Sequence, residues 1–349
     1  MKKRGRSAVI VVSVVFFAAS LLPDSGIATN NNGRQFPDKG SVSMAHSGKD
    51  SLQNGRYLKN NDTISDLLKH PAFKGFGQHL LTRDEDIHNQ KLRLSDIATL
   101  LPYHSFVRPD VVVRALNHII HDAGEGKKIF YDLYTDRQKR ENSTKNSTGL
   151  FFFRGRPGAP FAVICPGGGF SYVGSLHEGF PYAAELSKAG YNAFVLRYRV
   201  NAGGAIATED LAKAISFIYA NADSLGVSRK NYSLWGSSAG ARMVAYIGSD
   251  GVAAFGGEKL PKPAVLVMAY TGHSSFTRND PPTFTIVSEN DGIVDASVVE
   301  KRINGMKRAG IDVEFYKYRS AGHGFGLGTG TDAEGWMAYA IRFWKKHLL

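Results

Sequence analysis

Cysteine is almost missing from this sequence, since its 349 residues include one, Cys165. A single thiol cannot form an intramolecular disulfide, which excludes the disulfide-stapled scaffolds of small secreted proteins. Cys165 lies within the apolar run 160–166, where a buried, unreactive thiol is the expected state. Stability must therefore come from a hydrophobic core.

An apolar run long enough to span a membrane is also missing near the N-terminus. The run 8–22 follows a basic start at residues 1–6, but it is shorter than the roughly 20 residues that cross a bilayer. Small residues, Gly26 and Ala28, come soon after it. This pattern predicts a signal peptide over residues 1–28, a secreted or periplasmic protein, and no stable membrane span after cleavage. An uncleaved N-terminal anchor is the alternative.

Motifs of nucleic-acid-binding modules are absent as well. The formal net charge is +12, yet the basic residues are dispersed and are not interleaved with aromatic residues. We therefore expect a solvated basic surface and no nucleic-acid partner, with attraction to an acidic cell surface or polysaccharide as the alternative. His104, His118 and His121 form no complete ligand pattern, so we expect no metal site and no cofactor.

Apolar residues, in contrast, make up 43% of the chain, enough for one substantial core. Residues 29–61 are rich in Asn, Gly, Ser, Asp and Lys, which indicates a flexible linker. Residues 62–127 have helical periodicity, clearest from Pro109 to Gly124, and predict a helical N-terminal region. Residues 128–349 have the pattern of an α/β catalytic domain.

Eight apolar runs typical of buried strands lie in this last part. They cover residues 129–135, 149–153, 161–165, 192–198, 232–235, 264–270, 283–288 and 313–318. Helical patterns alternate with the later runs, at residues 178–189, 209–225, 239–248, 296–309 and 334–347. The alternation predicts a mostly parallel sheet with helices on both faces. A polar turn around residues 142–148 joins the first two runs, so this pair is expected to be antiparallel.

A nucleophile motif follows the fifth run. Residues 236–240 read Gly-Ser-Ser-Ala-Gly and match G-x-S-x-G, in which a tight strand-to-helix turn exposes the central hydroxyl, here that of Ser238. A serine hydroxyl needs a base to take its proton and a carboxylate to orient that base. In the expected chain order, Asp291 follows the seventh run and His323 follows the eighth.

Other residues compete for these roles. Asp291 stands in Asn-Asp-Gly, a strong turn signal, so it can be read as a turn residue, with Glu289 or Asp295 as the acid. His273 is the rival base, but it precedes the proposed acid in the chain. We favour Asp291 and His323 because their order and positions fit the triad.

A glycine-rich turn, Pro-Gly-Gly-Gly-Phe at residues 166–170, follows the third run. Glycines permit backbone conformations that bring amide N–H groups to a developing oxyanion. Together with the N–H of Ala239, this turn is predicted to form an oxyanion hole.

The four motifs together resemble the α/β-hydrolase esterases of the acetyl esterase and hormone-sensitive-lipase-like group, over residues 128–349. The resemblance implies Ser238 as nucleophile, Asp291 as acid, His323 as base, and the amides of Gly168, Gly169 and Ala239 as oxyanion donors. This sequence departs from the group at Pro166, where His is usual, and at Ala241, where glycine is common. The departures concern subfamily and substrate, not the triad.

The expected activity is hydrolysis of short acyl or acetyl carboxylic esters, on a small molecule or a polysaccharide, through an acyl-enzyme on Ser238. Alternatives are an exported polysaccharide deacetylase, a peptidase of the same fold and a non-catalytic binding protein. Residues 271–282 are too few for a large lid. We therefore expect the N-terminal region, with Phe73, Phe76 and Tyr103, to pack beside the site and narrow it. The sequence does not indicate an oligomeric state.

Overall fold

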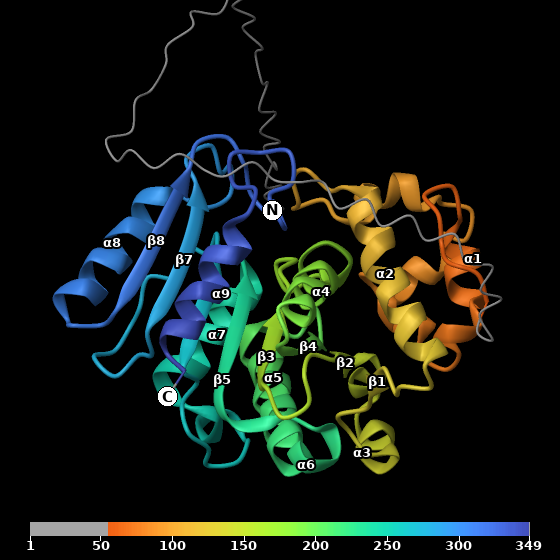
Figure 1. Ribbon diagram of the computed structural model, residues 1–349, viewed down its shortest axis with the longest axis horizontal. Coiled ribbons are helices and arrows are strands. Elements are labelled where there is room, and N and C mark those ends of the chain that lie inside the picture. Colours follow the sequence, from red (N-terminus) through yellow and green to blue (C-terminus); the bar gives the residue numbers. More distant parts are fainter. Residues whose placement is uncertain (1–54, 349) are drawn as a thin grey trace, which may run out of the picture. The chain divides into compact units, whose positions relative to one another are not determined.

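A computed structural model describes residues 55–348, and an eight-stranded sheet lies at their centre (Figure 1). The order of strands across the sheet is β1-β2-β4-β3-β5-β6-β7-β8. The strands are β1 (Phe130–Tyr131), β2 (Gly149–Phe153), β3 (Pro160–Cys165), β4 (Asn192–Arg197), β5 (Ser228–Ser237), β6 (Val265–Ala269), β7 (Thr283–Ser288) and β8 (Val313–Tyr318). Strand β2 is antiparallel to both β1 and β4, and all other neighbours are parallel. The predicted mostly parallel sheet with an antiparallel start is confirmed.

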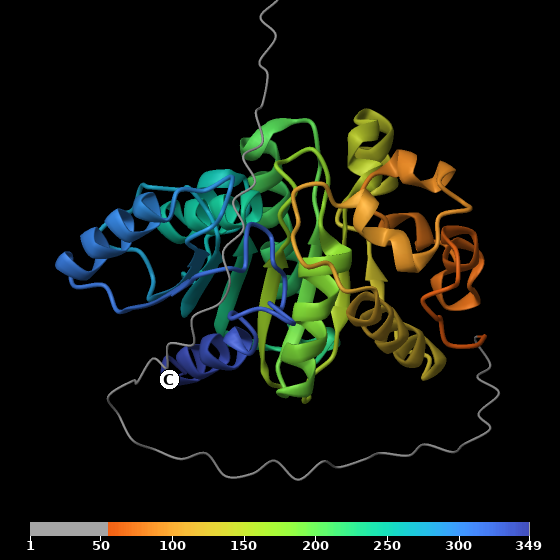
Figure 2. The same cartoon turned by 90° about the horizontal axis from the view of Figure 1, so that it is seen from above.

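Helices cover both faces of this sheet (Figure 2). On one face lie α4 (Phe180–Lys188) and α9 (Trp336–Lys346), and on the other lie α5 (Gly203–Ala220), α7 (Ala239–Asp250) and α8 (Ala296–Arg308). Because side chains alternate along a strand, Ile164 packs into the core under α4 and α9, whereas its neighbour Val163 packs under α5 and α7. Near-continuous apolar strands are what a sheet buried on both faces requires.

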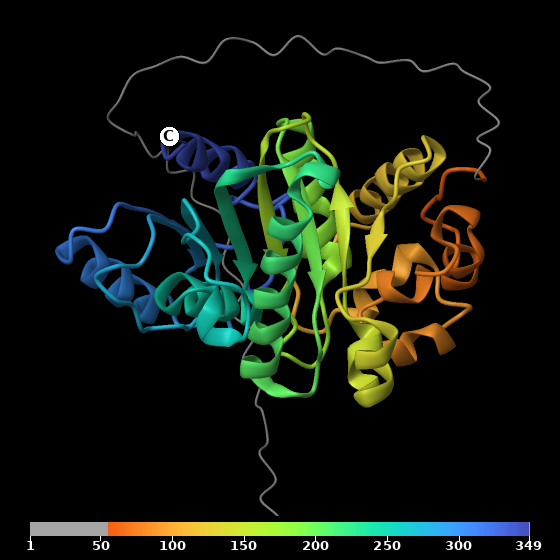
Figure 3. The ribbon, with the colours of Figure 1, turned by 90° about the horizontal axis from the view of Figure 1, so that it is seen from below.

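The parallel register brings several strand ends to one edge of the sheet. Cys165 pairs with Gly236, and Ser237 pairs with Ala269, so β3, β5 and β6 end side by side. Viewed from below, these central strands run between the two helical layers (Figure 3). Loops that follow the strands at this edge can therefore meet.

Two local predictions need correction. The connection between β1 and β2 is not a simple polar turn, because it contains helix α3 (Asp136–Glu141) and the 3₁₀ turn η5 (Ser143–Ser147). Thr135 caps α3, since its hydroxyl accepts the N–H of Gln138. The helix expected at residues 209–225 begins earlier, at Gly203, and is followed by the separate short helix α6 (Ala222–Leu225).

Residues 62–127 contain short helical turns and one long helix. These are α1 (Ile64–Lys69), η1 (Pro71–Phe73), η2 (Gly77–Leu80), η3 (Asp84–His88), η4 (Leu94–Leu100) and α2 (Pro109–Gly124). Leu58 is buried, and its N–H donates to Asn117 of α2 at 2.8 Å, so the packed chain begins before residue 62. The predicted signal peptide and most of the predicted linker lie outside the described residues. Among residues 55–348, no helix has the length and apolar character needed to cross a bilayer.

Candidate active site

Ser238 lies in the turn between β5 and α7, with backbone angles φ 49° and ψ −112°. Few residues other than glycine adopt such a conformation, and strain of this kind is often held at functional sites. Gly236 and Gly240, on either side of Ser238, must be glycine because a larger residue would collide with neighbouring backbone atoms. A Cβ on Gly240 would lie 1.9 Å from the carbonyl oxygen of Cys165, and one on Gly236 would lie 2.6 Å from Cα of Ala241. The first turn of α7 therefore passes directly over the end of β3.

The structure brings Ser238, His323 and Asp291 together. The Nε2 atom of His323 lies 3.0 Å from Oγ of Ser238, and its Nδ1 atom lies 2.8 Å from Oδ2 of Asp291. A carboxylate can only accept, so Nδ1 carries the proton that it donates to Asp291. Nε2 is then left to accept the proton of the serine hydroxyl. This is the hydrogen-bond order of a base poised to activate a nucleophile.

The side chain of Asp291 is fully buried and is held by its own loop. Its Oδ1 atom accepts the N–H groups of Ile293 and Val294, both at 2.8 Å. Asn-Asp-Gly is thus a turn, as its composition suggests, and the same carboxylate also orients the imidazole. Turn residue and orienting acid are compatible roles for Asp291.

The competing residues have other partners. Glu289 forms an ion pair with Lys317 at 3.0 Å, and Asp295 caps α8 by accepting the N–H of Ser297. His273 packs edge-on against Tyr246, with ring centroids 5.3 Å apart. Burial, together with Arg302 and Arg242, lowers the pKa of His273 to about 4. Within the described chain, none of the three competing side chains hydrogen-bonds to Ser238.

The glycine-rich turn lies beside Ser238, since a Cβ on Gly167 would be 3.0 Å from Cβ of that serine. Gly168, Gly169 and Phe170 have φ values of 131°, 62° and 60°, which turn the backbone sharply after β3. No hydrogen bond found among residues 55–348 uses the amides of Gly168, Gly169 or Ala239. The amide of Gly167, in contrast, donates to Oε2 of Glu178 at 2.5 Å.

A cavity of about 250 Å³ opens at Ser238. Its lining is mostly small or apolar, and consists of Gly169, Phe170, Ser238, Ala239, Arg242, Thr271, Gly272, Ile293 and Val294. Gly169 and Ala239 thus face the same space as the serine, whereas Gly168 is not part of the lining. Arg242 is the one charged side chain in it, and within residues 55–348 it forms no ion pair. The cavity thus combines the Ser238 hydroxyl, the amides of Gly169 and Ala239, and the positive charge of Arg242.

Sequence reasoning missed a buried carboxylate behind the site, Glu178. It lies on the π-helical turn η6 (Ser175–Gly179) and is fully buried. Its Oε1 atom lies 3.1 Å from Nε2 of His104 and accepts the hydroxyl of Tyr270 at 2.6 Å. The helical pattern of residues 178–189 places Glu178 at the first position of a predicted helix, where charged side chains usually face solvent. Nothing in the local pattern indicates a buried acid here.

Of the aromatic residues expected to narrow the site, Tyr103 alone lies beside it. A Cβ on Gly169 would be 3.1 Å from the ring of Tyr103. Phe76 instead stacks on Phe130 of β1, with centroids 5.7 Å apart, and Phe73 packs against Phe76. Those two side chains belong to the core that packs against β1, the outermost strand of the sheet.

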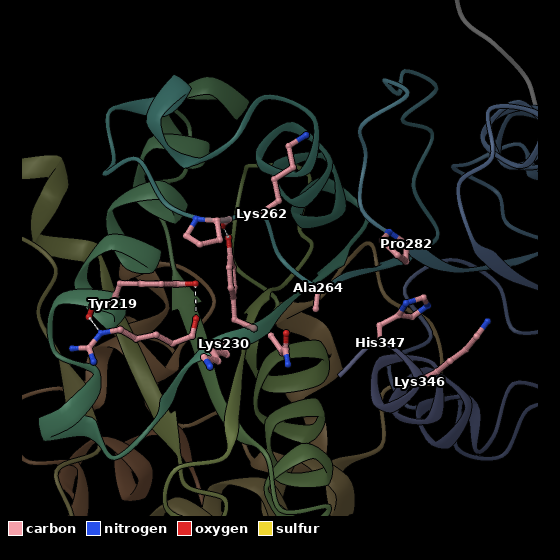
Figure 4. Close-up of a pocket in the computed structure, with 11 residues that line it drawn as sticks. Tyr219, Lys230, Lys262, Ala264, Pro282, Lys346 and His347 are labelled. Atoms are coloured by element: carbon pink, nitrogen blue, oxygen red, sulfur yellow. Dashed lines mark hydrogen bonds between the residues drawn. The ribbon is translucent and has the colours of Figure 1, made fainter. Parts of the chain in front are cut away.

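A second hollow, of about 700 Å³, lies at the opposite edge of the sheet (Figure 4). Ala264 and Pro282 in its lining precede β6 and β7, so it opens at the amino ends of the strands. Lys346 in its wall is paired with Asp312, and Arg229 is paired with Asp223. None of the predicted site residues lines this hollow, and in the described part of the chain no group of three or more His, Cys, Asp or Glu residues could hold a metal ion.

Comparisons with known proteins find similarity to esterases and hydrolases. The BD-FAE family model matches residues 154–259, a stretch that contains the glycine-rich turn and Ser238. An acetylxylan esterase from Xylanibacter ruminicola is 24% identical over 208 residues, which cover 51% of this chain and 43% of that protein. The match therefore spans less than half of the relative's length.

Solved structures give a more extensive match. An acetyl ester-xyloside bifunctional hydrolase from Caldicellulosiruptor lactoaceticus superposes with a TM-score of 0.54 at 18% identity, over 62% of this chain and 95% of that one. A carboxylesterase from Lactobacillus plantarum WCFS1 gives 0.51 at 20% identity, over 58% and 94%. At these identities the similarity establishes a shared fold.

Proposed function

We propose that this α/β-hydrolase-fold protein, which resembles the acetyl esterase group, is a serine carboxylesterase that cleaves short acyl esters. One observation carries the proposal: the imidazole of His323 lies 3.0 Å from the hydroxyl of Ser238 on one side and 2.8 Å from the carboxylate of Asp291 on the other. The acetylxylan esterase relative supports ester hydrolysis as the reaction class.

In the proposed mechanism, Oγ of Ser238 attacks the ester carbonyl while Nε2 of His323 takes the hydroxyl proton. Asp291 stabilises the imidazolium that forms. The carbonyl oxygen becomes an oxyanion, which the amides of Gly168, Gly169 and Ala239 are proposed to bind. The imidazolium then protonates the leaving alkoxide, and an acyl ester remains on Ser238. Water, activated by the same imidazole, attacks this ester and releases the acid.

The size of the cavity supports a short acyl group. At about 250 Å³ it is smaller than the roughly 300–1,000 Å³ of typical small-molecule sites. Ile293, Val294 and Phe170 give its lining large apolar groups. Acetyl groups carried by a polysaccharide are the finer proposal, which the name of the acetylxylan esterase relative favours.

We also propose that the protein is exported from the cytoplasm. It rests on the basic start, apolar run and small residues of the predicted signal peptide, residues 1–28. A protein that acts outside the cytoplasm has access to extracellular polysaccharide esters, which is consistent with the substrate proposed.

Hydrolysis of p-nitrophenyl esters of graded acyl length tests this function. We expect kcat/KM for acetate and propionate to exceed that for octanoate by about 10-fold or more, since the extra methylenes of octanoate would overpack the cavity at a cost of about 1–3 kcal/mol. Ser238→Ala should reduce hydrolysis to the background rate. Equal rates for the two proteins would remove the assignment, and a preference for octanoate would remove the short-acyl proposal alone.

The unpaired Arg242 predicts a preference for esters that carry a negative charge near the carbonyl. An exposed ion pair contributes up to about 1 kcal/mol, so Arg242→Ala should lower kcat/KM for 4-acetoxybenzoate about fivefold at low salt. The rate for neutral p-nitrophenyl acetate should stay the same, and Arg242→Lys should retain most of the preference. Added salt should weaken the effect through screening. An equal loss for both esters would contradict a charge-specific role.

A further inference from the structure

A short segment of the N-terminal region, residues 103–105, lies between the two loops that carry the proposed chemistry. The N–H of Ser105 donates to the carbonyl oxygens of His323 and Gly324, at 3.0 and 3.2 Å. The N–H of Tyr103 donates to the hydroxyl of Tyr172 at 3.0 Å, just after the glycine-rich turn. The loop that carries His323, residues 321–326, is called the histidine loop. We call residues 103–105 the bridging segment, because it hydrogen-bonds to the histidine loop on one side and to Tyr172, which follows the glycine-rich turn, on the other.

The contacts of the bridging segment leave no space for side chains on the facing loops. A Cβ on Gly174 would lie 2.7 Å from Nε2 of His104. On the histidine loop, a Cβ on Gly324 would lie 2.6 Å from the carbonyl oxygen of Tyr103, and one on Gly322 would lie 2.8 Å from Oγ of Ser105. The bridging segment therefore fixes how far apart the two loops lie.

Glu178 is the buried anchor beneath this arrangement. It accepts hydrogen bonds from three parts of the chain: the amide of Gly167, the hydroxyl of Tyr270 and the ring of His104. Burial by itself raises the pKa of this carboxyl, but His104 and the hydrogen bonds outweigh it and lower the pKa to about 2. Glu178 is thus ionised at neutral pH, and all its donors are directed at a charge.

Each residue that donates a hydrogen bond to Glu178 adjoins or contacts a part of the proposed site. Gly167 directly precedes the two glycines whose amides are proposed to bind the oxyanion. Tyr270 packs its ring against the imidazole of His323, with centroids 5.2 Å apart and planes at 64°. His104 belongs to the bridging segment. One carboxylate therefore connects the oxyanion turn, the backing of the base and the N-terminal region.

We propose that Glu178 is a positioning residue for the acyl transfer, holding the glycine-rich turn and the His323 ring in register, with His104 of the bridging segment as its partner. The inference rests on the proposed esterase function. Glu178 itself touches neither substrate nor reacting atoms, because its carboxylate is fully buried and its oxygens are occupied by protein donors. The N-terminal region is thereby part of the machinery and not only a cover.

Glu178→Gln tests this role with almost no change in shape. The amide has one acceptor oxygen in place of two, so its N–H groups face either Gly167, which shifts the glycine-rich turn, or Tyr270 and His104, which shifts the residues behind His323. Misplacement by about 1 Å can cost on the order of 100-fold in rate. We expect kcat for p-nitrophenyl acetate to fall 10- to 100-fold with KM changed less than threefold, when rates are referred to active sites titrated by burst amplitude. Glu185→Gln, a partly exposed carboxylate on α4, is the matched control and should behave like wild type.

Hydrogen exchange gives a readout that does not depend on activity. In Glu178→Gln, the peptide that contains Gly167 should exchange at least 10-fold faster, because its amide loses an ionised acceptor. If Glu178→Gln does not fold, His104→Gln decides: it leaves the carboxylate in place and should lower kcat about 10-fold. Unchanged kcat in the folded variant overturns the positioning role, whether or not exchange changes. A wild type without Ser238-dependent hydrolysis would instead overturn the function, and the exchange result would still stand.

Discussion

Replacing His323 with alanine is expected to lower kcat for p-nitrophenyl acetate by about 10⁴- to 10⁶-fold, with KM nearly unchanged. Without the imidazole, no other base among residues 55–348 hydrogen-bonds to the hydroxyl of Ser238, which lies 3.0 Å from the His323 ring. The residual rate should come from binding and from the oxyanion donors. Single-turnover measurements with high enzyme concentration can quantify such a loss.

The effects of the triad residues should not add. A nucleophile without its base, or a base without its nucleophile, is inactive as a unit, so Ser238→Ala combined with His323→Ala should be no slower than either single variant. Asp291→Asn should cost about 10⁴-fold, because the wrong tautomer is favoured. His88→Ala, an exposed histidine of η3, is the control. Additive losses in the double variant would show that the two residues act independently.

Gly240→Ala should strongly destabilise the protein. The new Cβ would lie 1.9 Å from the carbonyl oxygen of Cys165 and 2.8 Å from that of Pro166. Both are backbone atoms of a buried strand end, so they cannot turn aside as a flexible side chain would. Overpacking of this kind costs about 3 kcal/mol or more, a large part of typical stability.

Urea unfolding followed by circular dichroism measures that loss. Gly77→Ala is the matched control, because a Cβ there would have its nearest neighbours at 3.5 Å, an ordinary contact distance. The control should shift the free energy of unfolding by less than about 1 kcal/mol. If Gly240→Ala is as stable as the control, α7 does not pass over β3 as closely as described.

Most of the sheet could be predicted because its central strands are buried on both faces. Strands β2 and β7, which are buried throughout, have the predicted bounds, and so does the less buried edge strand β8. The remaining runs identify their strands within a few residues, because continuous apolar stretches leave few alternatives. The first half of β5 was missed, since residues 228–231 are polar and partly exposed. Its pairing with β3 comes from tertiary context that no local pattern contains.

In the candidate site, too, some residues could be predicted from the sequence and others could not. The proposed triad could be predicted because its chemistry demands particular residue types after particular strands, and the structure brings those residues within hydrogen-bond distance. Glu178 and His104 have no such signature. They are 74 positions apart in the chain and meet only because η6 and the bridging segment converge behind the glycine-rich turn. Buried polar partners of this kind are set by the completed fold.

The narrow fit around the bridging segment constrains how this chain can vary. Gly174, Gly322 and Gly324 are kept free of side chains by backbone and side-chain atoms of residues 103–105, which lie far from them in sequence. A shorter or displaced bridging segment would relieve the steric conflict at these positions, although Gly322 and Gly324, with φ of 70° and 63°, would still favour glycine. A bulkier residue at any of the three would force the segment out. These stretches can therefore be exchanged between related proteins only as a set, and a chimera that takes the hydrolase part without its own N-terminal partner should lose the spacing between its two loops.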